Sequence, residues 1–203
     1  DGENCIVVVP GANQTLLPQH VDAVAAELSS ARVVVAQLET PLATVFHALA
    51  IARRAGAFTM LNAAPAAVLS PQQLQAVQWL VVNESEAAML LGSAVDDLTQ
   101  ARAAAQALRA LGTGDVVITL GAEGLVHAGA DGVTHHATAK VTAVDTTGAG
   151  DTFVGVLAAA LAQGLPAQDA LRRGQAAAAI AVTSRGAQAA MPMRAEVEAR
   201  LTP

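Results

Sequence analysis

Short apolar runs rich in β-branched residues alternate along the chain with longer segments in which alanine and other helix formers recur. The short runs predict strands at 5–9, 33–38, 58–62, 79–83, 116–120, 124–128 and 133–136. The longer segments predict helices at 18–30, 41–55, 84–91, 97–111, 149–163, 167–183 and 194–201. Strands that alternate with helices need crossover connections, so the pattern predicts an α/β fold with a largely parallel sheet.

The boundaries of several predicted helices carry recognisable signals. Thr40-Pro41 and Ser70-Pro71 each offer an N-cap residue followed by proline at the first helical position. Gly56 and Gly112 stand where glycine commonly ends a helix. The predicted strands are continuously apolar, as expected of a sheet covered by helices on both faces. In such sheets, ligands bind at the carboxyl ends of the strands.

Composition narrows the classes of function that remain. The 203 residues are 53% hydrophobic and 14% charged, with a net charge of -6, which suits a well-buried domain and excludes intrinsic disorder. No run approaches the roughly 18 to 20 apolar residues of a membrane span, so we expect no membrane partner. The one lysine, Lys140, leaves no basic stripe for nucleic acid. The single cysteine, Cys5, fits a reducing cytoplasm.

A glycine-rich segment at 145–151 leads into the predicted helix at 149–163 and includes its first residues. Small residues at 148–150 let backbone N–H groups converge, and the positive end of the helix adds to them, so the turn suits an anion. Asp151 would repel a phosphate, but it suits accepting a proton from a nucleophile that attacks phosphorus. A plain loop in which Asp151 helps to cap the helix is the alternative.

Asn83 and Glu86 follow the predicted strand at 79–83 with a spacing of three residues. That spacing places both side chains on one face of a helix, where an amide and a carboxylate can order Mg²⁺-bound water and phosphate. The same pair also fits a capping box, and the two roles can coexist.

The segment 145–155 resembles the C-terminal signature of the phosphofructokinase-B, or ribokinase-like, carbohydrate kinase family. Seven further blocks match the family in the same order, at 2–4, 10–13, 37–41, 62–66, 83–86, 119–124 and 181–188. The resemblance implies a three-layer α/β/α fold in which residues 1–203 form the C-terminal portion of one kinase domain. The family's first strands, its lid and the Gly-Gly-x-Gly-x-Asn segment that clasps the sugar have no counterpart here.

The resemblance also assigns roles near the signature. It implies that Asp151 is the general base that removes a proton from a sugar hydroxymethyl and touches the substrate. It implies that the backbone of Gly148, Ala149 and Gly150 stabilises charge on the transferred phosphoryl group. Glu39 matches a sugar-binding carboxylate, with an exposed glutamate at a strand end as the alternative.

Nucleotide contacts are implied at three further places. Asn83 and Glu86 match the residues that organise Mg²⁺ with ATP. The family's ATP-binding segment matches Thr119, Leu120, Gly121, Ala122, Glu123 and Gly124. This segment also fits a hairpin turn into the next strand. Gln175 matches a position that lines the adenine site, although a core or surface glutamine is the alternative.

A monovalent-cation site is implied beside the anion hole, where potassium activates members of the family. Its matching ligands are the Asp145 side chain and the carbonyl groups of Thr147, Ala181, Ser184 and Gly186. One carboxylate with several carbonyls suits a loosely held K⁺. Ala190 stands where the family often has a serine ligand, which leaves the occupancy of the site open.

The resulting hypothesis is a cytoplasmic kinase that transfers the γ-phosphoryl group of Mg-ATP to the 5-hydroxyl of D-ribose. Fructose, a sugar acid or a nucleoside remain alternative substrates, because the discriminating residues lie mostly in the absent portion. A truncated, non-catalytic nucleotide-binding remnant is the alternative from another class. The family's lid also forms its dimer contact, so the full-length protein is expected to be a homodimer.

Overall fold

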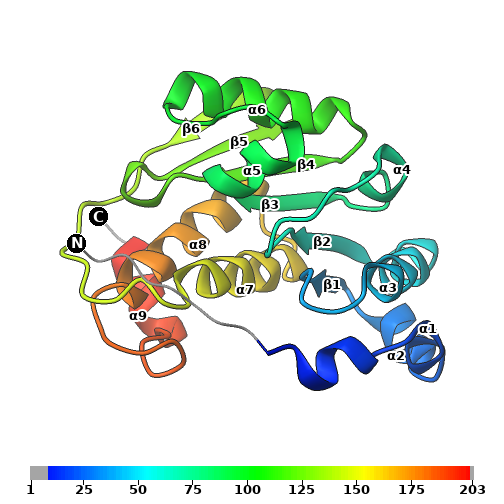
Figure 1. The fold of residues 1–203 in the computed structure, drawn as a ribbon. Helices are drawn as coiled ribbons and strands as arrows, with labels where there is room; N and C mark the ends of the chain where they lie inside the picture. The colour runs from blue at the N-terminus through cyan, green and yellow to red at the C-terminus, as the bar shows by residue number, and fades with distance from the viewer. Residues whose placement is uncertain (1–8, 202–203) are drawn as a thin grey trace.

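The computed structural model describes residues 9–201, which form a central sheet between two layers of helices (Figure 1). Within these residues the sheet has six strands in the order β1-β2-β3-β4-β5-β6. Their bounds are β1 Val33–Ala36, β2 Phe58–Asn62, β3 Trp79–Asn83, β4 Asp115–Thr119, β5 Leu125–Gly129 and β6 Gly132–His136. Strands β1 to β4 are parallel, and β5 and β6 complete the sheet as an antiparallel hairpin. The predicted α/β fold with a largely parallel sheet is confirmed.

Nine α-helices and two short 3-10 helices connect and flank the described strands. The α-helices are α1 Pro18–Asp22, α2 Ala25–Ser30, α3 Leu42–Arg54, α4 Pro71–Leu74, α5 Glu84–Leu91, α6 Leu98–Ala110, α7 Ala149–Ala162, α8 Ala167–Ala181 and α9 Arg194–Leu201. The 3-10 helices are η1 Gly11–Thr15 and η2 Gly121–Glu123. None of the helices in this part of the chain is long and apolar enough to cross a membrane.

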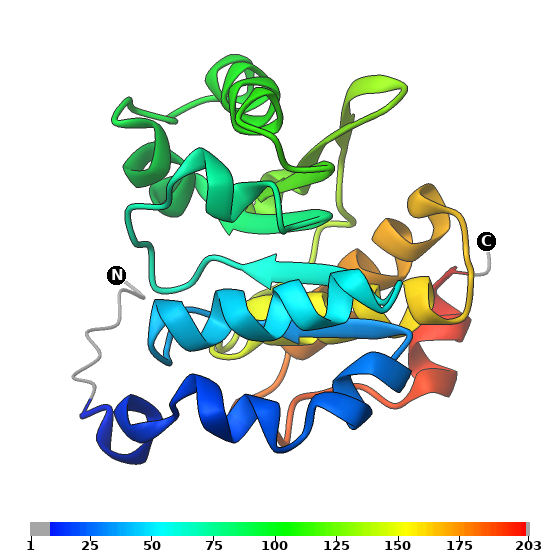
Figure 2. The ribbon, with the colours of Figure 1, turned by 90° about the vertical axis from the view of Figure 1, so that its right-hand side faces the viewer.

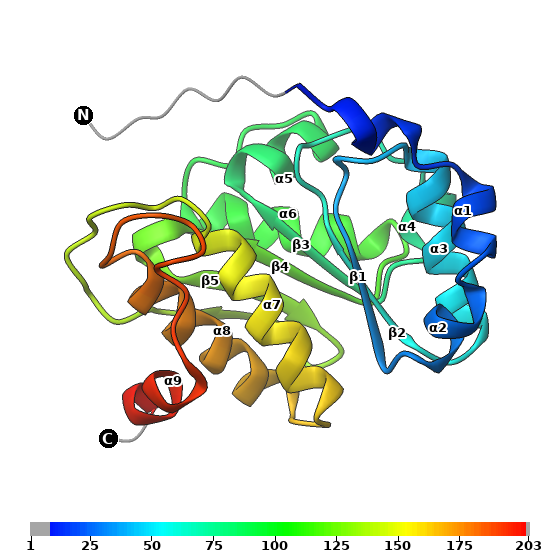
Figure 3. The same ribbon diagram turned by 90° about the horizontal axis from the view of Figure 1, so that it is seen from below.

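Each face of the sheet packs against its own group of helices, which explains why the strands are apolar on both sides. On one face, Leu61 and Leu80 are fully buried with side chains from α3 and α6, such as Leu49 and Leu108. On the other face, Trp79 and further strand residues pack against α7 and α8. Figure 3 shows α7 and α8 lying in front of the sheet, with α5 and α6 behind it.

The predicted end signals of the helices are mostly confirmed. Ser70 caps α4 by accepting a hydrogen bond from the Gln73 amide, with Pro71 at the first helical position. Gly56 and Gly112 follow α3 and α6 with φ values of 87° and 115°, a backbone conformation that favours glycine. The signal at Thr40-Pro41 is shifted by one residue, because Pro41 has an extended ψ of 131° and is itself the N-cap of α3.

The prediction of one continuous helix at 18–30 is wrong. Val24 leaves the helical conformation, with φ -119° and ψ 23°, and separates α1 from α2. Val21 of α1 is buried, Leu28 of α2 packs against the hydrophobic core, and each short helix contacts α3 separately. Figure 2 shows the two helices as separate turns along the lower side of the molecule.

Two predicted strands also need comment. The strand at 33–38 ends earlier, at Ala36, because the Leu38 amide leaves the ladder and donates to the Ala64 carbonyl at 2.9 Å. Most of the predicted strand at 5–9 lies outside the described residues. Strand β1 pairs only with β2 among the described residues, so it stands at one edge of the sheet.

The contact between α7 and α8 yields a test of the packing. A Cβ atom built on Gly174 of α8 would lie 2.8 Å from the Phe153 ring of α7, closer than real side chains approach. We predict that Gly174→Ala destabilises the chain by about 1–3 kcal/mol, because the ring must move within a packed core. The measurement is the free energy of unfolding in urea.

Gly155 of α7 is the matched control, because a Cβ atom there would have no heavy atom within 4 Å apart from its own turn of the helix. Gly155→Ala should leave the stability unchanged or raise it by up to about 1 kcal/mol, the helix propensity gain of alanine. Equal unfolding free energies for the two variants would contradict the described packing of α7 on α8.

Candidate active site

The carboxyl ends of β1 to β4 and the beginning of α7 enclose a cleft of about 220 Å³. This is the edge at which a parallel sheet is expected to bind ligands. The predicted site residues that line the cleft are Glu39, Asn83, Glu86, Thr119, Gly148, Gly150 and Asp151. They come from the ends of β1, β3 and β4 and from the start of α7, which are far apart in the sequence.

The first turn of α7 presents backbone amides at the cleft. Gly148 is the N-cap residue in the left-handed conformation, with φ 77°. The Ala149 amide donates to the Thr146 carbonyl at 3.2 Å, and the first bond within the helix runs from the Thr152 amide to the Gly148 carbonyl. By helix geometry, the amides of Gly150 and Asp151 have no acceptor within α7. A Cβ atom on Gly150 would meet no atom within 4 Å apart from its own turn of the helix, so there is open space on the side-chain side of this residue.

Asp151 is an exposed side chain that is held by a neighbouring strand. Its Oδ1 accepts a hydrogen bond of 3.1 Å from Nε2 of Gln37, which follows the end of β1. The same Nε2 donates to Oδ1 of Asn62, the last residue of β2, at 3.2 Å. The carboxylate of α7 is thereby tied to two strand ends.

Asn83 and Glu86 form the capping box that the sequence permits. The Asn83 side chain accepts from the Glu86 amide, and the Glu86 carboxylate accepts from the Asn83 amide, both at 2.8 Å. Burial raises the pKa of the Glu86 carboxyl above its usual value, although the hydrogen bond from the Asn83 backbone acts in the opposite direction. The cap accounts for one oxygen of each side chain while both residues still line the cleft.

The cleft carries negative charge. Glu39, Glu86 and Asp151 line it, and no lysine or arginine stands among its described lining residues. A polyphosphate would be repelled unless a cation lay between it and the carboxylates. Mg²⁺ prefers oxygen ligands such as those of carboxylate and amide groups, so the residues present fit a magnesium-bound nucleotide.

The structure brings three residues of the predicted cation site into contact, namely Asp145, Thr147 and Gly186. Asp145 accepts from the amides of Thr147 and Gly186, each at 2.9 Å, and thus joins the loop before α7 to the loop after α8. These hydrogen bonds, the one from Gly186 first, lower the pKa of Asp145 to about 2. Ala181 ends α8, and its carbonyl accepts from the Ser184 amide at 3.3 Å. Asp145 is therefore ionised at any physiological pH.

Other predicted nucleotide contacts lie outside this cleft. Of the segment 119–124, only Thr119 lines it, while Leu120 is buried and Gly121–Glu123 form η2. This segment does form the predicted turn between β4 and β5. Gln175 is partly buried on α8 and donates to the His136 carbonyl at 2.8 Å, so it connects α8 to β6.

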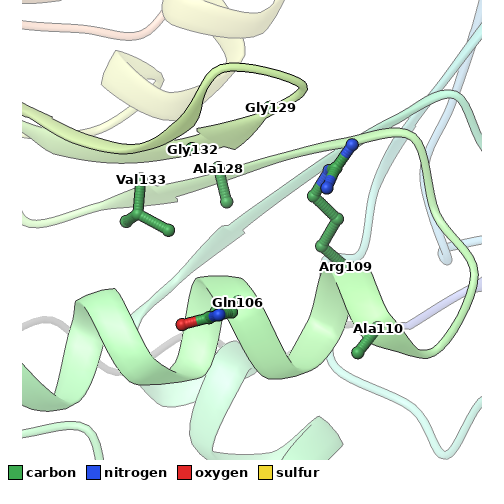
Figure 4. Close-up of a pocket in the computed structure, with 7 residues that line it drawn as sticks. All are labelled: Gln106, Arg109, Ala110, Ala128, Gly129, Gly132 and Val133. Atoms are coloured by element: carbon green, nitrogen blue, oxygen red, sulfur yellow. The ribbon is translucent and has the colours of Figure 1, made fainter.

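A second cleft, of about 410 Å³, lies between α6 and the hairpin of β5 and β6 (Figure 4). Arg109 and Gln106 extend into it from α6, opposite Val133. It contains none of the predicted site residues. Among residues 9–201, no group of three or more His, Cys, Asp or Glu side chains is placed to hold a metal ion.

The sequence reading missed two polar members of the first cleft, Gln37 and Asn62. Each is a polar residue at or next to the end of a mostly apolar predicted strand. That position at a strand end was the available signal, and it is the same one that drew attention to Glu39.

Comparisons with known proteins show which family the chain belongs to. A family model described as pfkB family carbohydrate kinase matches residues 1–194. The chain is 43% identical over 202 residues to the ribokinase of Mus musculus, with 97% of this chain and 62% of the relative covered. It therefore spans less than two thirds of the length of this curated relative.

Solved structures of ribokinases are also similar to this chain. The ribokinase of Thermotoga maritima matches with a TM-score of 0.88 and 34% identity, covering 100% of this chain and 66% of that one. The ribokinase of Arabidopsis thaliana, solved in complex with ribose and ATP, matches with a TM-score of 0.88 and 27% identity over the same shares. The matched family model spans nearly the whole chain, so the chain belongs to the pfkB family of carbohydrate kinases.

Proposed function

We propose that this chain is the nucleotide-binding and catalytic portion of an ATP-dependent sugar kinase. The kinase transfers the γ-phosphoryl group of ATP to the 5-hydroxyl of D-ribose. The observation that carries the proposal is the position of Asp151, a carboxylate beside the open amides of the α7 N-terminus within the cleft. Membership of a carbohydrate kinase family supports the class of reaction.

In the proposed reaction, the sugar hydroxyl oxygen forms a bond to the γ-phosphorus while the bond from that phosphorus to the β-γ bridging oxygen breaks. The hydroxyl proton passes to the Asp151 carboxylate, and ADP leaves. Phosphoryl transfer has a loose transition state, so correct positioning and neutralisation of charge contribute more than a strong base. An ordinary aspartate is sufficient for this step.

The anion hole follows from the same geometry. Charge on the transferred phosphoryl oxygens would be stabilised by the backbone of residues 148–150 and the positive end of α7. The Gly150 amide is the strongest candidate donor, because it has no acceptor in the helix and its residue lines the cleft without a side chain of its own. The Ala149 amide is the weaker one, since it already donates to Thr146.

Metal ions complete the proposal. Asn83 and Glu86 would hold Mg²⁺ through its bound water, and the ion would offset the charge between the phosphates and the carboxylates of the cleft. Thr119 lies in the same cleft, and the segment 120–124 with Gln175 would contact the rest of the nucleotide. Asp145 and the carbonyl groups of Thr147, Ala181, Ser184 and Gly186 would bind an activating K⁺.

The choice of ribose rests on the similarity to ribokinases from animals and plants. Glu39 lines the cleft and is exposed, which suits a carboxylate that accepts hydrogen bonds from sugar hydroxyls. The complete protein would work in the cytoplasm as a homodimer, with the portion absent from these 203 residues supplying the lid and the rest of the sugar pocket.

One observation favours a second candidate, a non-catalytic nucleotide-binding remnant. The chain covers only 62% of the mouse relative, and β1 stands at an edge of the described sheet. Measurements of Mg-ATP binding and of sugar phosphorylation by the complete gene product distinguish the two candidates. Binding of Mg-ATP without any phosphorylation of a sugar would support the remnant.

The proposed base is tested by Asp151→Asn in the complete gene product. This nearly isosteric change removes the proton acceptor, so kcat for ribose phosphorylation should fall by about 10²–10⁴-fold while Mg-ATP still binds. The measurement is ADP release in steady state. Asp131→Asn, in the exposed turn between β5 and β6, should retain full activity. A kcat for Asp151→Asn near that of the parent would exclude Asp151 as the base.

The proposed anion hole is tested by Gly150→Ala. The added methyl group meets no protein atom beyond its own turn of the helix, so the fold should be retained, but it takes up space beside the amide in the cleft that residue 150 lines. We expect kcat to fall by about 10²-fold, because a phosphoryl group kept away from the amide loses one such donor. Gly155→Ala on the same helix controls for the change in helix propensity. If both variants keep equal activity, the amide of Gly150 has no part in the reaction.

A further inference from the structure

Gln37 contacts two partners that are distant in sequence but adjacent in the fold. Its Nε2 lies 3.1 Å from Oδ1 of Asp151, which is 114 positions away, and 3.2 Å from Oδ1 of Asn62. The side chain is partly buried at the exit of β1 and lines the cleft. Each hydrogen of its NH₂ group therefore has an acceptor.

The direction of these hydrogen bonds is fixed from both ends. Nδ2 of Asn62 donates to the Val81 carbonyl at 3.2 Å, and a carbonyl can only accept. The Asn62 oxygen must then face Gln37, which has to offer its NH₂ group there. At the other end, an ionised Asp151 can also only accept. The two amide side chains consequently have a single orientation that satisfies every partner.

Asn62, which orients Gln37, is itself held in place by the ends of the strands. Asn62 is only 9% exposed, and its backbone neighbours are bonded across the strand ends. The Ala63 amide donates to the Val81 carbonyl at 3.0 Å, and the Leu38 amide donates to the Ala64 carbonyl at 2.9 Å. Gln37 thus extends from an ordered framework toward an exposed carboxylate on another element.

We propose that Gln37, oriented by Asn62, is a positioning residue for Asp151. It holds Oδ1 of the carboxylate and fixes its plane, so that Oδ2 is the oxygen that receives the proton of the sugar hydroxyl. The inference rests on the proposed function, because it assigns the partner that orients the base. Nothing else among the described side chains donates to this carboxylate.

Free rotation of an exposed carboxylate would spread Oδ2 over several positions. Reaction needs the proton acceptor within hydrogen-bond reach of the hydroxyl, and a misplacement of about 1 Å can cost about 10²-fold in rate. A residue that restricts this rotation acts on kcat and not on the affinity for nucleotide. This difference separates a positioning role from a structural one.

Gln37→Met is the test, because methionine has nearly the same length and shape but no N–H group. In the complete gene product, we expect kcat to fall by about 10–10²-fold with KM for Mg-ATP changed by less than about twofold. The matched control is Gln163→Met, an exposed glutamine at the opposite end of α7, which should leave both constants unchanged.

Gln37→Glu provides a readout that a purely structural role would not give. The new carboxylate would lie against Asp151, and two carboxylates in contact share one proton. The acid limb of kcat against pH should therefore move to higher pH in Gln37→Glu, and stay in place in Gln163→Met. An unshifted acid limb would overturn the proposal.

The contact itself is tested in the present chain by NMR, without any turnover. Asp151→Asn should shift the side-chain NH₂ signals of Gln37, and Gln37→Met should shift those of Asn62, whereas Gln163→Met should shift neither. Unmoved Gln37 signals would overturn the positioning role whatever the activity. If Asp151→Asn is inactive and Gln37→Met has the parent kcat, positioning fails and the kinase assignment stands. If the parent phosphorylates no sugar, the kinase assignment fails.

Discussion

The direction of α7 depends on one turn, and the rest of the site depends on that direction. Gly148 adopts a left-handed conformation there, and a Cβ atom would lie 3.1 Å from Cα of Ala187. Asp145 secures the same turn by accepting from the amides of Thr147 and Gly186. With the turn held in this way, the first residues of α7 line the cleft at the ends of the parallel strands.

This arrangement places opposite electrostatic elements in one cleft. The amides at the start of α7 favour an anion, while Glu39, Glu86 and Asp151 favour a cation or a proton. A magnesium-bound polyphosphate next to a hydroxyl group satisfies both preferences. The nucleotide binding that we propose would thus need no basic patch in a chain with a net charge of -6. The proposal that Asp151 accepts a proton follows from this arrangement, because a carboxylate beside an anion site would repel the phosphate.

Local signals in the sequence predicted most of the fold and part of the site. Asn83, Glu86 and the glycine-rich turn were found because their spacing has a meaning within one helix. The break at Val24 and the early end of β1 were missed, since packing on α3 and a bond to Ala64 cause them. The contact of Gln37 with Asp151 spans 114 positions, and no periodic pattern could have revealed it.

The central proposal is that Asp151 faces the hydroxyl that is phosphorylated. A crystal structure of the complete gene product with D-ribose, Mg²⁺ and a non-hydrolysable ATP analogue measures this directly. We predict that the 5-hydroxyl lies within hydrogen-bond distance of one Asp151 oxygen, that Gln37 donates to the other, and that the Gly150 amide points at the γ-phosphate. A γ-phosphate bound away from α7, or a sugar hydroxyl that meets another base, would contradict it.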